Sequence, residues 1–383
     1  MEEETKNVLV SLLADAADYI EYGYSSSKTK IGVTVYGSEH GVDEIIRGVQ
    51  LALSRDADLK VILIGSSGTD NLDGVPAKHD VEAHAVMEKM LDAGELDAAV
   101  TMHYSFPLGT ATIGRVVTPA KGKEMFITTT TGTADTDRVK ALIKNAIYGI
   151  ATAKACGRKD PTVGILNLDG ASQAEKSLQQ LQRGGYPFTF AQSDRADGGT
   201  LMRGNDLLQG IADVMVTDSL TGNVLMKMLS AFNTGGSYEA LGYGYGPGLS
   251  QDVEKIICIV SRASGAPVIA GAIEYAARSV RGNLLALVKE EFAAASKAGL
   301  QDILSAIKVN TRQETEEIVP PPLKAVTGEI IGIDILEIES AVASLWQEKL
   351  YAESGMGCSG PVIKVAEEDI EAAVAILQSN SFI

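Results

Sequence analysis

The sequence lacks long apolar runs. None of its hydrophobic stretches reaches the roughly 20 residues that a membrane-spanning helix needs, although 45% of the 383 residues are hydrophobic. The chain opens with Met1-Glu-Glu-Glu-Thr-Lys6, without the basic start of a secretion signal. We therefore expect a cytoplasmic protein with no membrane partner. The length allows one large α/β unit or two ordinary domains.

Cysteine is also scarce. The three cysteines, Cys156, Cys258 and Cys358, lie far apart and form no Cys-x-x-Cys pair, which argues against a structural zinc site and a disulfide framework. No metal site is predicted. Cys156, at a probable helix end, and Cys258, in the apolar run 256–260, are interpreted as small buried hydrophobic residues.

Cys358 has a different setting, because it lies in the glycine-rich segment Gly355-Met-Gly-Cys-Ser-Gly-Pro361. Flanking glycines allow unusual backbone angles and let another group approach the sulfur closely. An acyl thioester on this thiol is chemically sensible. A small residue in a tight turn explains the same pattern, and the residues alone leave both interpretations open.

Positive charge is in short supply. The chain has 33 Lys and Arg against 50 Asp and Glu, for a formal net charge of −17. Nucleic acids and anionic membranes need a basic surface, so neither is an expected partner. A small anion can still be held by backbone N–H groups and a helix N-terminus. Any anion site would therefore be local and concave.

Short apolar runs alternate with helical patterns along most of the chain. This alternation predicts an α/β fold with a doubly wound, mostly parallel sheet and helices on both faces. In such sheets ligands bind beyond the carboxyl ends of the strands. The runs that we interpret as strands are 31–35, 59–64, 98–102, 125–128, 162–167 and 214–217.

Three parts are expected. Residues 1–28 form an amphipathic leading helix, which suggests a subunit contact and hence an oligomer. Residues 29–318 form the α/β core. The prolines of Glu317–Leu323 break any helix, and residues 319–383 form a small C-terminal α/β unit. Within that unit we predict a helix around 336–352, a strand at 362–365 and a helix at about 367–377.

The most informative segment is 212–227, which combines a buried strand, a short loop with glycine and a helix. We expect Thr221 or Asn223 to cap that helix, and its free N–H groups would face an anion. Helix capping alone is the commoner reason for Thr-Gly-Asn at such a turn. The residues assigned to a phosphate site here are Asp218, Ser219, Thr221, Gly222 and Asn223.

The string Val216-Thr-Asp-Ser-Leu-Thr-Gly-Asn-Val-Leu-Met-Lys227 resembles the signature of the phosphate acyltransferases, a family related to phosphotransacetylases. Segments 33–40, 164–169 and 264–271 resemble other family motifs in the same order, so the resemblance covers roughly residues 30 to 300. It implies production of acyl phosphates. The family's His-Gly pair is replaced in Ala277-Arg-Ser-Val-Arg-Gly282, and its acidic opening is replaced by Thr34-Val-Tyr-Gly-Ser-Glu39.

The added C-terminal unit with its cysteine makes the whole chain similar to the alpha subunits of component C of glycine/sarcosine/betaine reductase complexes. That resemblance implies that an acetyl group leaves a carboxymethylated selenoprotein A and becomes a thioester on Cys358. Phosphate then releases it as acetyl phosphate. The component C beta subunit is the implied partner, and no cofactor is expected.

The candidate site combines residues from several segments. Cys358 and Asn223 are the catalytic candidates, and the further phosphate-binding candidates come from the motifs and the ends of predicted strands: Asn167, His40, Lys176, Thr131 and Gly132. His103 is a further candidate, whereas His79 and His84 are interpreted as surface residues. Two alternatives remain: a phosphotransacetylase or acyl carrier protein phosphate acyltransferase without a covalent intermediate, and a noncatalytic binding subunit.

Overall fold

The computed structural model describes residues 28–69, 71–195, 198–307, 319–333, 338–357, 360–380 and 382–383. The predicted leading helix, residues 1–28, lies outside the described residues except for Lys28. Cys358 also lies outside them. The predicted boundary at residue 318 falls between two described segments.

Twelve strands of the described residues form one mixed sheet. They are β1 (Thr29–Thr34), β2 (Leu59–Ile64), β3 (Asp73–Val75), β4 (Ala98–Thr101), β5 (Ala111–Val117), β6 (Glu124–Gly132), β7 (Thr162–Leu166), β8 (Thr189–Phe190), β9 (Leu201–Met202), β10 (Val214–Val216), β11 (Gly246–Leu249) and β12 (Ile257–Ile259). Their order is β3-β2-β1-β4-β12-β11-β5-β6-β10-β7-β8, with β9 beside β7.

The sheet contains two parallel blocks. β3, β2, β1, β4 and β12 pair in parallel, and so do β6, β10, β7, β8 and β9. Between the blocks, β11 is antiparallel to β12 and to β5, and β5 is antiparallel to β6. The predicted mostly parallel sheet is confirmed. The antiparallel centre was not predicted, and it makes the two parallel blocks run in opposite directions.

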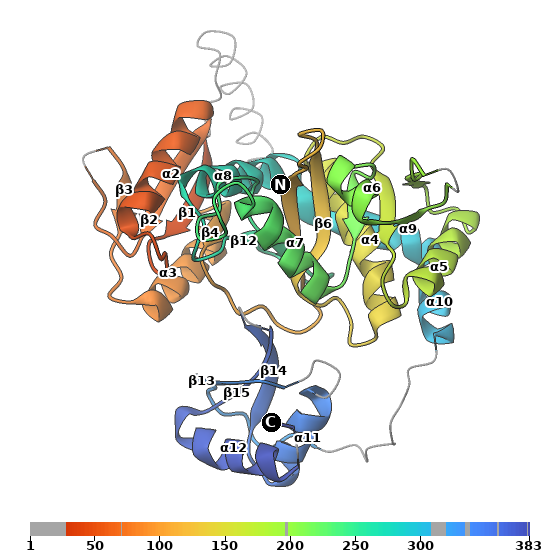
Figure 1. Cartoon of the computed structure of the whole chain (residues 1–383). Coiled ribbons are helices and arrows are strands. Elements are labelled where there is room, and N and C mark those ends of the chain that lie inside the picture. Colours follow the sequence, from red (N-terminus) through yellow and green to blue (C-terminus); the bar gives the residue numbers. More distant parts are fainter. Residues whose placement is uncertain are drawn as a thin grey trace, which may run out of the picture.

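Helices cover both faces of the sheet (Figure 1). They are α2 (Val42–Arg55), α3 (Asp80–Asp92), α4 (Arg138–Ala155), α5 (Ala171–Arg183), α6 (Gly204–Gln209), α7 (Ser219–Ala231), α8 (Ala266–Arg281), α9 (Leu284–Lys297) and α10 (Leu300–Ala306). The core is accordingly divided into two apolar clusters. Along β10, for example, Val214 and Val216 belong to one cluster and Met215 to the other, as the alternation of side chains in a strand requires.

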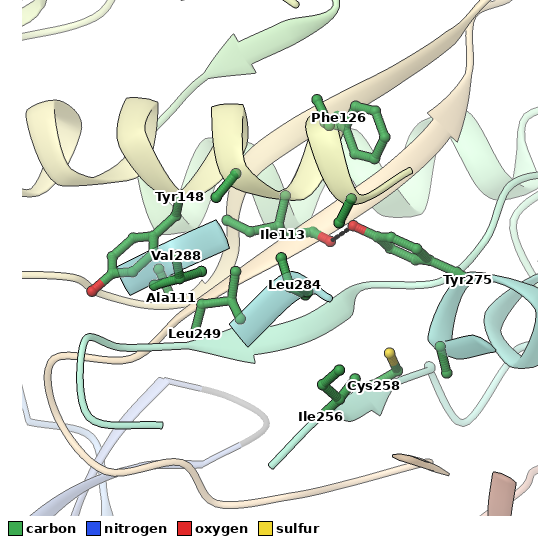
Figure 2. Packing of buried hydrophobic residues seen from close by; sticks show 14 of the residues in the cluster. Ala111, Ile113, Phe126, Tyr148, Leu249, Ile256, Cys258, Tyr275, Leu284 and Val288 are labelled. Carbon is green, nitrogen blue, oxygen red and sulfur yellow. Dashed lines mark hydrogen bonds between the residues drawn. The ribbon is translucent and has the colours of Figure 1, made fainter. Parts of the chain in front are cut away.

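Figure 2 shows part of the larger cluster, where the buried Tyr275 hydroxyl donates a hydrogen bond of 2.9 Å to the Ile113 carbonyl. Cys258 lies in the same cluster and is fully buried. Cys156 is half-buried at the end of α4. Burial raises the pKa of the Cys156 thiol to about 11 and that of Cys258 further. Both thiols are therefore poor nucleophiles near neutral pH.

The C-terminal unit has its own sheet and core. It consists of β13 (Gly328–Ile331), α11 (Ile338–Gln347), β14 (Ala352–Gly357), β15 (Gly360–Val365), the 3-10 helix η1 (Glu367–Asp369) and α12 (Ile370–Ser379). The strands are antiparallel in the order β13-β15-β14. The predicted long helix is wrong at its carboxyl end, because Lys349 adopts a left-handed conformation after α11 and the chain turns into β14. Much of the glycine-rich segment is therefore strand.

The unit contacts the sheet through the segment 105–108, which follows β4. The Met356 N–H donates to the Phe106 carbonyl at 3.0 Å, Gly355 forms a bridge with Pro107, and Leu108 packs against the unit's apolar core. Ser105 also donates a hydrogen bond of 2.9 Å to Glu329 on β13. Figure 1 shows the unit as a separate body (blue) that meets the core near the upper end of β14. The end of β14 is thereby held against the core.

Candidate functional site

The amino end of α7 lies directly after β10, as the sequence predicts, but its cap is neither Thr221 nor Asn223. Asp218 is the N-cap, and its carboxylate accepts the Thr221 N–H at 2.8 Å. The Gly222 N–H donates to the Asp218 carbonyl at 2.9 Å. Two of the N–H groups predicted to face an anion are thus used within the helix. A capping carboxylate satisfies one of the otherwise unpaired donors at a helix start.

Gly222 lies inside the helix and not in a loop. A Cβ atom built on it would stand 1.8 Å from the Thr129 carbonyl oxygen, so only glycine permits this approach of α7 to β6. One residue later, the Asn223 side-chain amide donates to the Thr130 carbonyl at 3.1 Å. The Thr-Gly-Asn string therefore fixes the first turn of α7 against the carboxyl end of β6.

A cavity of about 320 Å³ opens beside this contact. Its walls come from the segments after β1, β4 and β12, from Thr131 at the end of β6, from the face of α7 that carries Asn223 and Lys227, and from Tyr245 before β11. Gly357, the last residue of β14, completes the lining. The sheet core and the C-terminal unit both contribute to one cavity.

The charged groups in the lining are Lys227, Arg262 and Glu39. The Lys227 ammonium lies 3.8 Å from a carboxylate oxygen of Glu239 and 3.5 Å from the Ser261 hydroxyl. Its nitrogen is 5.7 Å from the centre of the Tyr245 ring. The two cations thus stand beside two carboxylates, Glu39 in the lining and Glu239 next to Lys227, so the cavity offers two cationic donors within a chain of net charge −17.

The carboxylate that positions Lys227 is itself buried. Glu239 accepts hydrogen bonds from Ser264 at 2.8 Å and from Tyr245 at 3.2 Å, and its side chain is only 3% exposed. Burial first, and then the Glu239 carboxylate, raise the pKa of Tyr245 well above its usual value. Tyr245 therefore remains a hydrogen-bond donor, and the ammonium of Lys227 faces a carboxylate held in a fixed orientation.

Lys227 was absent from the predicted site residues. Its signal was present, because it stands four residues after Asn223 in the string 216–227 and such residues share a helix face. Arg262, in the loop after β12, had no comparable signal. Only the folded chain brings that loop opposite α7.

Of the other predicted residues, Thr131 and Asn223 line the cavity. Gly132 follows Thr131 with a φ of 74°, and a Cβ on it would stand 2.2 Å from the Thr110 carbonyl oxygen. His40 lies behind the lining, with Nε2 3.3 Å from the carbonyl oxygen of Ala263. Asp218 and Gly222 serve the helix start, and Ser219 and Thr221 also lie outside the lining.

Asn167 and Lys176 are not brought to the cavity. Both are exposed, at the end of β7 and on α5 respectively. β10 separates β7 from β6 in the sheet, and neither Asn167 nor Lys176 is among the residues that line the cavity.

The histidines differ in their surroundings. His79 caps α3 by accepting the Glu82 N–H at 3.2 Å. His84 is not a simple surface residue, since its side chain is 18% exposed and Nε2 lies 3.0 Å from the Thr101 hydroxyl. Its ring stands 6.3 Å from that of His103. Burial lowers the pKa of His103 below its usual value.

Two features are absent from the described residues. Within them, no group of three or more His, Cys, Asp or Glu side chains is arranged to hold a metal ion. In the same residues, no helix is both long and apolar enough to cross a membrane.

The model of a family described as fatty acid synthesis protein matches residues 29–364. The component C subunit alpha of the glycine/sarcosine/betaine reductase complex of Peptoclostridium acidaminophilum is 50% identical over 382 residues, which cover 99% of each chain. The chain belongs to the component C alpha subunit family. The resemblance stated from the sequence is confirmed.

Members of this family are related to phosphate acyltransferases. The phosphate acyltransferase of Thermotoga neapolitana is 25% identical over 315 residues, covering 67% of this chain and 94% of its own. That of Thermotoga petrophila is 28% identical over 235 residues, covering 54% and 69%. Among solved structures, a branched-chain phosphotransacylase from Enterococcus faecalis V583 is 16% identical with a TM-score of 0.47, covering 66% of this chain and 99% of its own.

Proposed function

We propose that this chain transfers an acetyl group from a thioester on Cys358 to phosphate, with acetyl phosphate as the product. One observation carries the proposal. Gly357, which directly precedes Cys358 in the sequence, lines the same cavity as Asn223, Lys227 and Arg262. This supports the proposal, because Cys358 is the next residue in the sequence after one that lines a cavity with two cationic side chains.

The residues that line the cavity suit the attack of phosphate on a thioester. A phosphate oxygen attacks the thioester carbonyl, a C–O bond forms, the C–S bond breaks, and the sulfur takes up the proton that phosphate gives. Lys227 and Arg262 neutralise the phosphate, since charge-assisted hydrogen bonds from cations are the strong ones. Asn223 uses one amide hydrogen on Thr130, which leaves its second for the oxyanion that develops on the carbonyl.

The acetyl group would come from the carboxymethylated selenoprotein A, with the component C beta subunit as a partner. Turning a carboxymethyl group into an acetyl thioester adds two electrons to carbon. The selenium must then leave in an oxidised form, bonded to a sulfur, while one oxygen leaves as water. The name of the 50% identical relative, a subunit of a reductase complex, supports other protein components as partners, and these two are the ones that the resemblance implies.

The test runs the reaction in reverse. The protein is incubated with acetyl phosphate, and the acetylated peptide is mapped by mass spectrometry while exchange of labelled phosphate into acetyl phosphate is measured. We expect acetylation at Cys358 and loss of exchange by at least a hundredfold in Cys358→Ala. Cys156→Ala, which changes a thiol outside the cavity lining, serves as the matched control and should remain active. A fully active Cys358→Ala variant would refute the covalent role.

The relationship to phosphate acyltransferases favours a second function, direct transfer between phosphate and a carrier thiol. That reaction needs no cysteine in this chain, so activity with coenzyme A or acyl carrier protein would survive loss of Cys358. A noncatalytic subunit is the third possibility, motivated by the missing His-Gly pair after the segment 264–271. It predicts no phosphate-dependent turnover, alone or with the partner subunit.

A further inference from the structure

A second cavity, of about 780 Å³, lies beside the cavity of about 320 Å³ described above. Most of its walls come from the segments 104–110 and 250–255 and from α4. Among the described residues, Tyr104 is the one that belongs to both linings. The two cavities therefore meet at this residue, and the reaction proposed above uses only the smaller one.

The larger cavity suits an apolar chain better than an anion. The Lys255 ammonium in its lining lies 2.8 Å from a carboxylate oxygen of Asp92. The Lys144 ammonium lies 2.6 Å from Asp135. Both lysines are thus paired, and two further carboxylates in the lining repel phosphate. The apolar residues of this lining are Phe106, Pro107, Leu108, Val253 and Ile257.

The ring of Tyr104 is held by three neighbours. Its hydroxyl donates a hydrogen bond of 2.9 Å to Glu88 on α3. Burial first, and then the Glu88 carboxylate, raise the pKa of Tyr104 above its usual value, so the hydroxyl remains a donor. The ring centre lies 4.8 Å from that of Phe106 and 5.9 Å from that of His84, both edge-on, as aromatic pairs prefer. A ring fixed in this way does not swing aside to admit a longer ligand.

We propose that the Tyr104 ring limits the length of the acyl chain that the smaller cavity accepts, and that the larger cavity takes up the end of a longer chain once this ring is removed. This rests on the function proposed above, in which Cys358 carries the acyl group. The substrates are then short-chain acyl thioesters and acyl phosphates, and Tyr104 is the residue that sets the limit.

The smaller lining has an apolar part in which the acyl chain is expected to lie. This part comes from the residues after β4 and from the end of β12, which pairs with β4, whereas Asn223 and Lys227 come from α7. Phosphate is held by the cations, so the hydrocarbon of the acyl group packs on the apolar residues, where it is best shielded from water. They are Met102, Tyr104, Ile259 and Val260.

Alkyl methanethiosulfonates test the length limit without the proposed reaction. The Cys358 thiolate attacks the sulfur that bears the alkyl group, a new S–S bond forms, the old one breaks and methanesulfinate leaves. Labelling of Cys358 by the methyl and the hexyl reagent is followed by mass spectrometry, and each rate is divided by that of a free thiol in solution. Wild type should favour methyl by about tenfold or more. Tyr104→Ala should raise the hexyl rate about tenfold and leave the methyl rate nearly unchanged, since each methylene that fits or fails to fit changes a rate by about that factor.

Three variants control this measurement. Tyr104→Phe keeps the ring and loses the bond to Glu88, so it should retain the preference for methyl. Val253→Ala enlarges only the larger cavity and should retain it too. Tyr104→Leu shortens the side chain with less loss of packing and should, like Tyr104→Ala, raise the hexyl rate. Cys258 is fully buried, so its labelling in any variant would reveal loss of the fold.

Acetyl phosphate and hexanoyl phosphate are then compared on the same proteins. Tyr104→Ala and Tyr104→Leu should gain hexanoylation at Cys358. If neither acyl phosphate reacts but the methyl preference still depends on Tyr104, the proposed function fails and the length limit stands. The same hexyl-to-methyl ratio in wild type, Tyr104→Ala and Tyr104→Leu overturns the length limit, whether or not acetyl phosphate reacts. A wild-type chain that accepts both lengths at equal rates also overturns it.

Discussion

The sheet core and the C-terminal unit are held together in different ways. The sheet is covered on both faces, and its two apolar clusters draw on almost every strand and helix of residues 28–307. The C-terminal unit has a small cluster of its own and meets the core at the segment 105–108 and at β6. One wall of the cavity, Gly357, therefore belongs to a body that can be loosened while the remaining walls stay in place.

Leu345→Ala should have the largest effect on stability. It should destabilise the C-terminal unit and leave the sheet core as stable as before. Leu345 is fully buried in the C-terminal cluster, and truncating a buried leucine costs about 3 kcal/mol. We expect hydrogen exchange to accelerate in β13, β14 and β15 while β1 and β6 remain protected. Leu323→Ala, the same change at a residue that is 86% exposed, should alter neither. Equal acceleration in β1 and β6 would show that the chain unfolds as one cooperative unit.

Gly222→Ala should instead destabilise the sheet core, lowering its free energy of unfolding by about 2 kcal/mol. The new methyl group would meet the Thr129 carbonyl oxygen at 1.8 Å, so α7 must shift away from β6. Denaturant unfolding of the core should move to lower concentration, and exchange in the C-terminal unit should not change. Gly204→Ala is the control, because nothing lies within 4 Å of a Cβ there. A Gly222→Ala variant as stable as wild type would contradict the close packing of α7.

The smallest expected effect concerns pH and the segment that joins the two bodies. Burial lowers the pKa of His103; the charges near it are Glu329 on β13, Asp80 and His84 on α3, and Arg262 after β12. Because the pKa of His103 is lower in the folded protein than in the unfolded chain, the contribution of His103 to the free energy of unfolding is complete above pH 6.5. It falls as the pH drops from 6.5 toward the folded pKa.

Exchange in β13 and β14 should therefore increase modestly on acidification through this range. His103→Gln should remove that part of the pH dependence, and His79→Gln, at an exposed cap on α3, should retain it. A pH dependence that is the same in wild type and His103→Gln would exclude His103 as its source.

Much of the sheet could be predicted because buried parallel strands are continuous apolar runs. The limits of β2 were predicted to the residue, and those of β7 within one residue. β11 is absent from the predicted strands. Pro247 and the glycines around it argue against a central strand, yet β11 pairs with both β12 and β5. Those pairings are distant in sequence and have no local signal.

Only part of the site could be predicted, again because contacts between residues distant in the sequence have no local signal. The strand-to-helix string located α7 and Asn223, but Asp218, Thr221 and Asn223 are all good caps, and the local pattern does not select among them. Lys227 is absent from the predicted residues, and a lysine on a helix usually faces solvent. Its role depends on Glu239, which the fold buries opposite it. Arg262 and Gly357 reach the cavity only through tertiary packing.

The docking of β14 has a consequence for how this family can vary. The Met356 N–H meets the Phe106 carbonyl, and Gly355 bridges Pro107, so peptide groups make these contacts. Substitution of side chains there leaves the peptide groups in place. The backbone pairing of β14 therefore sets the location of Gly357. An alignment of residue identities alone would not reveal that location.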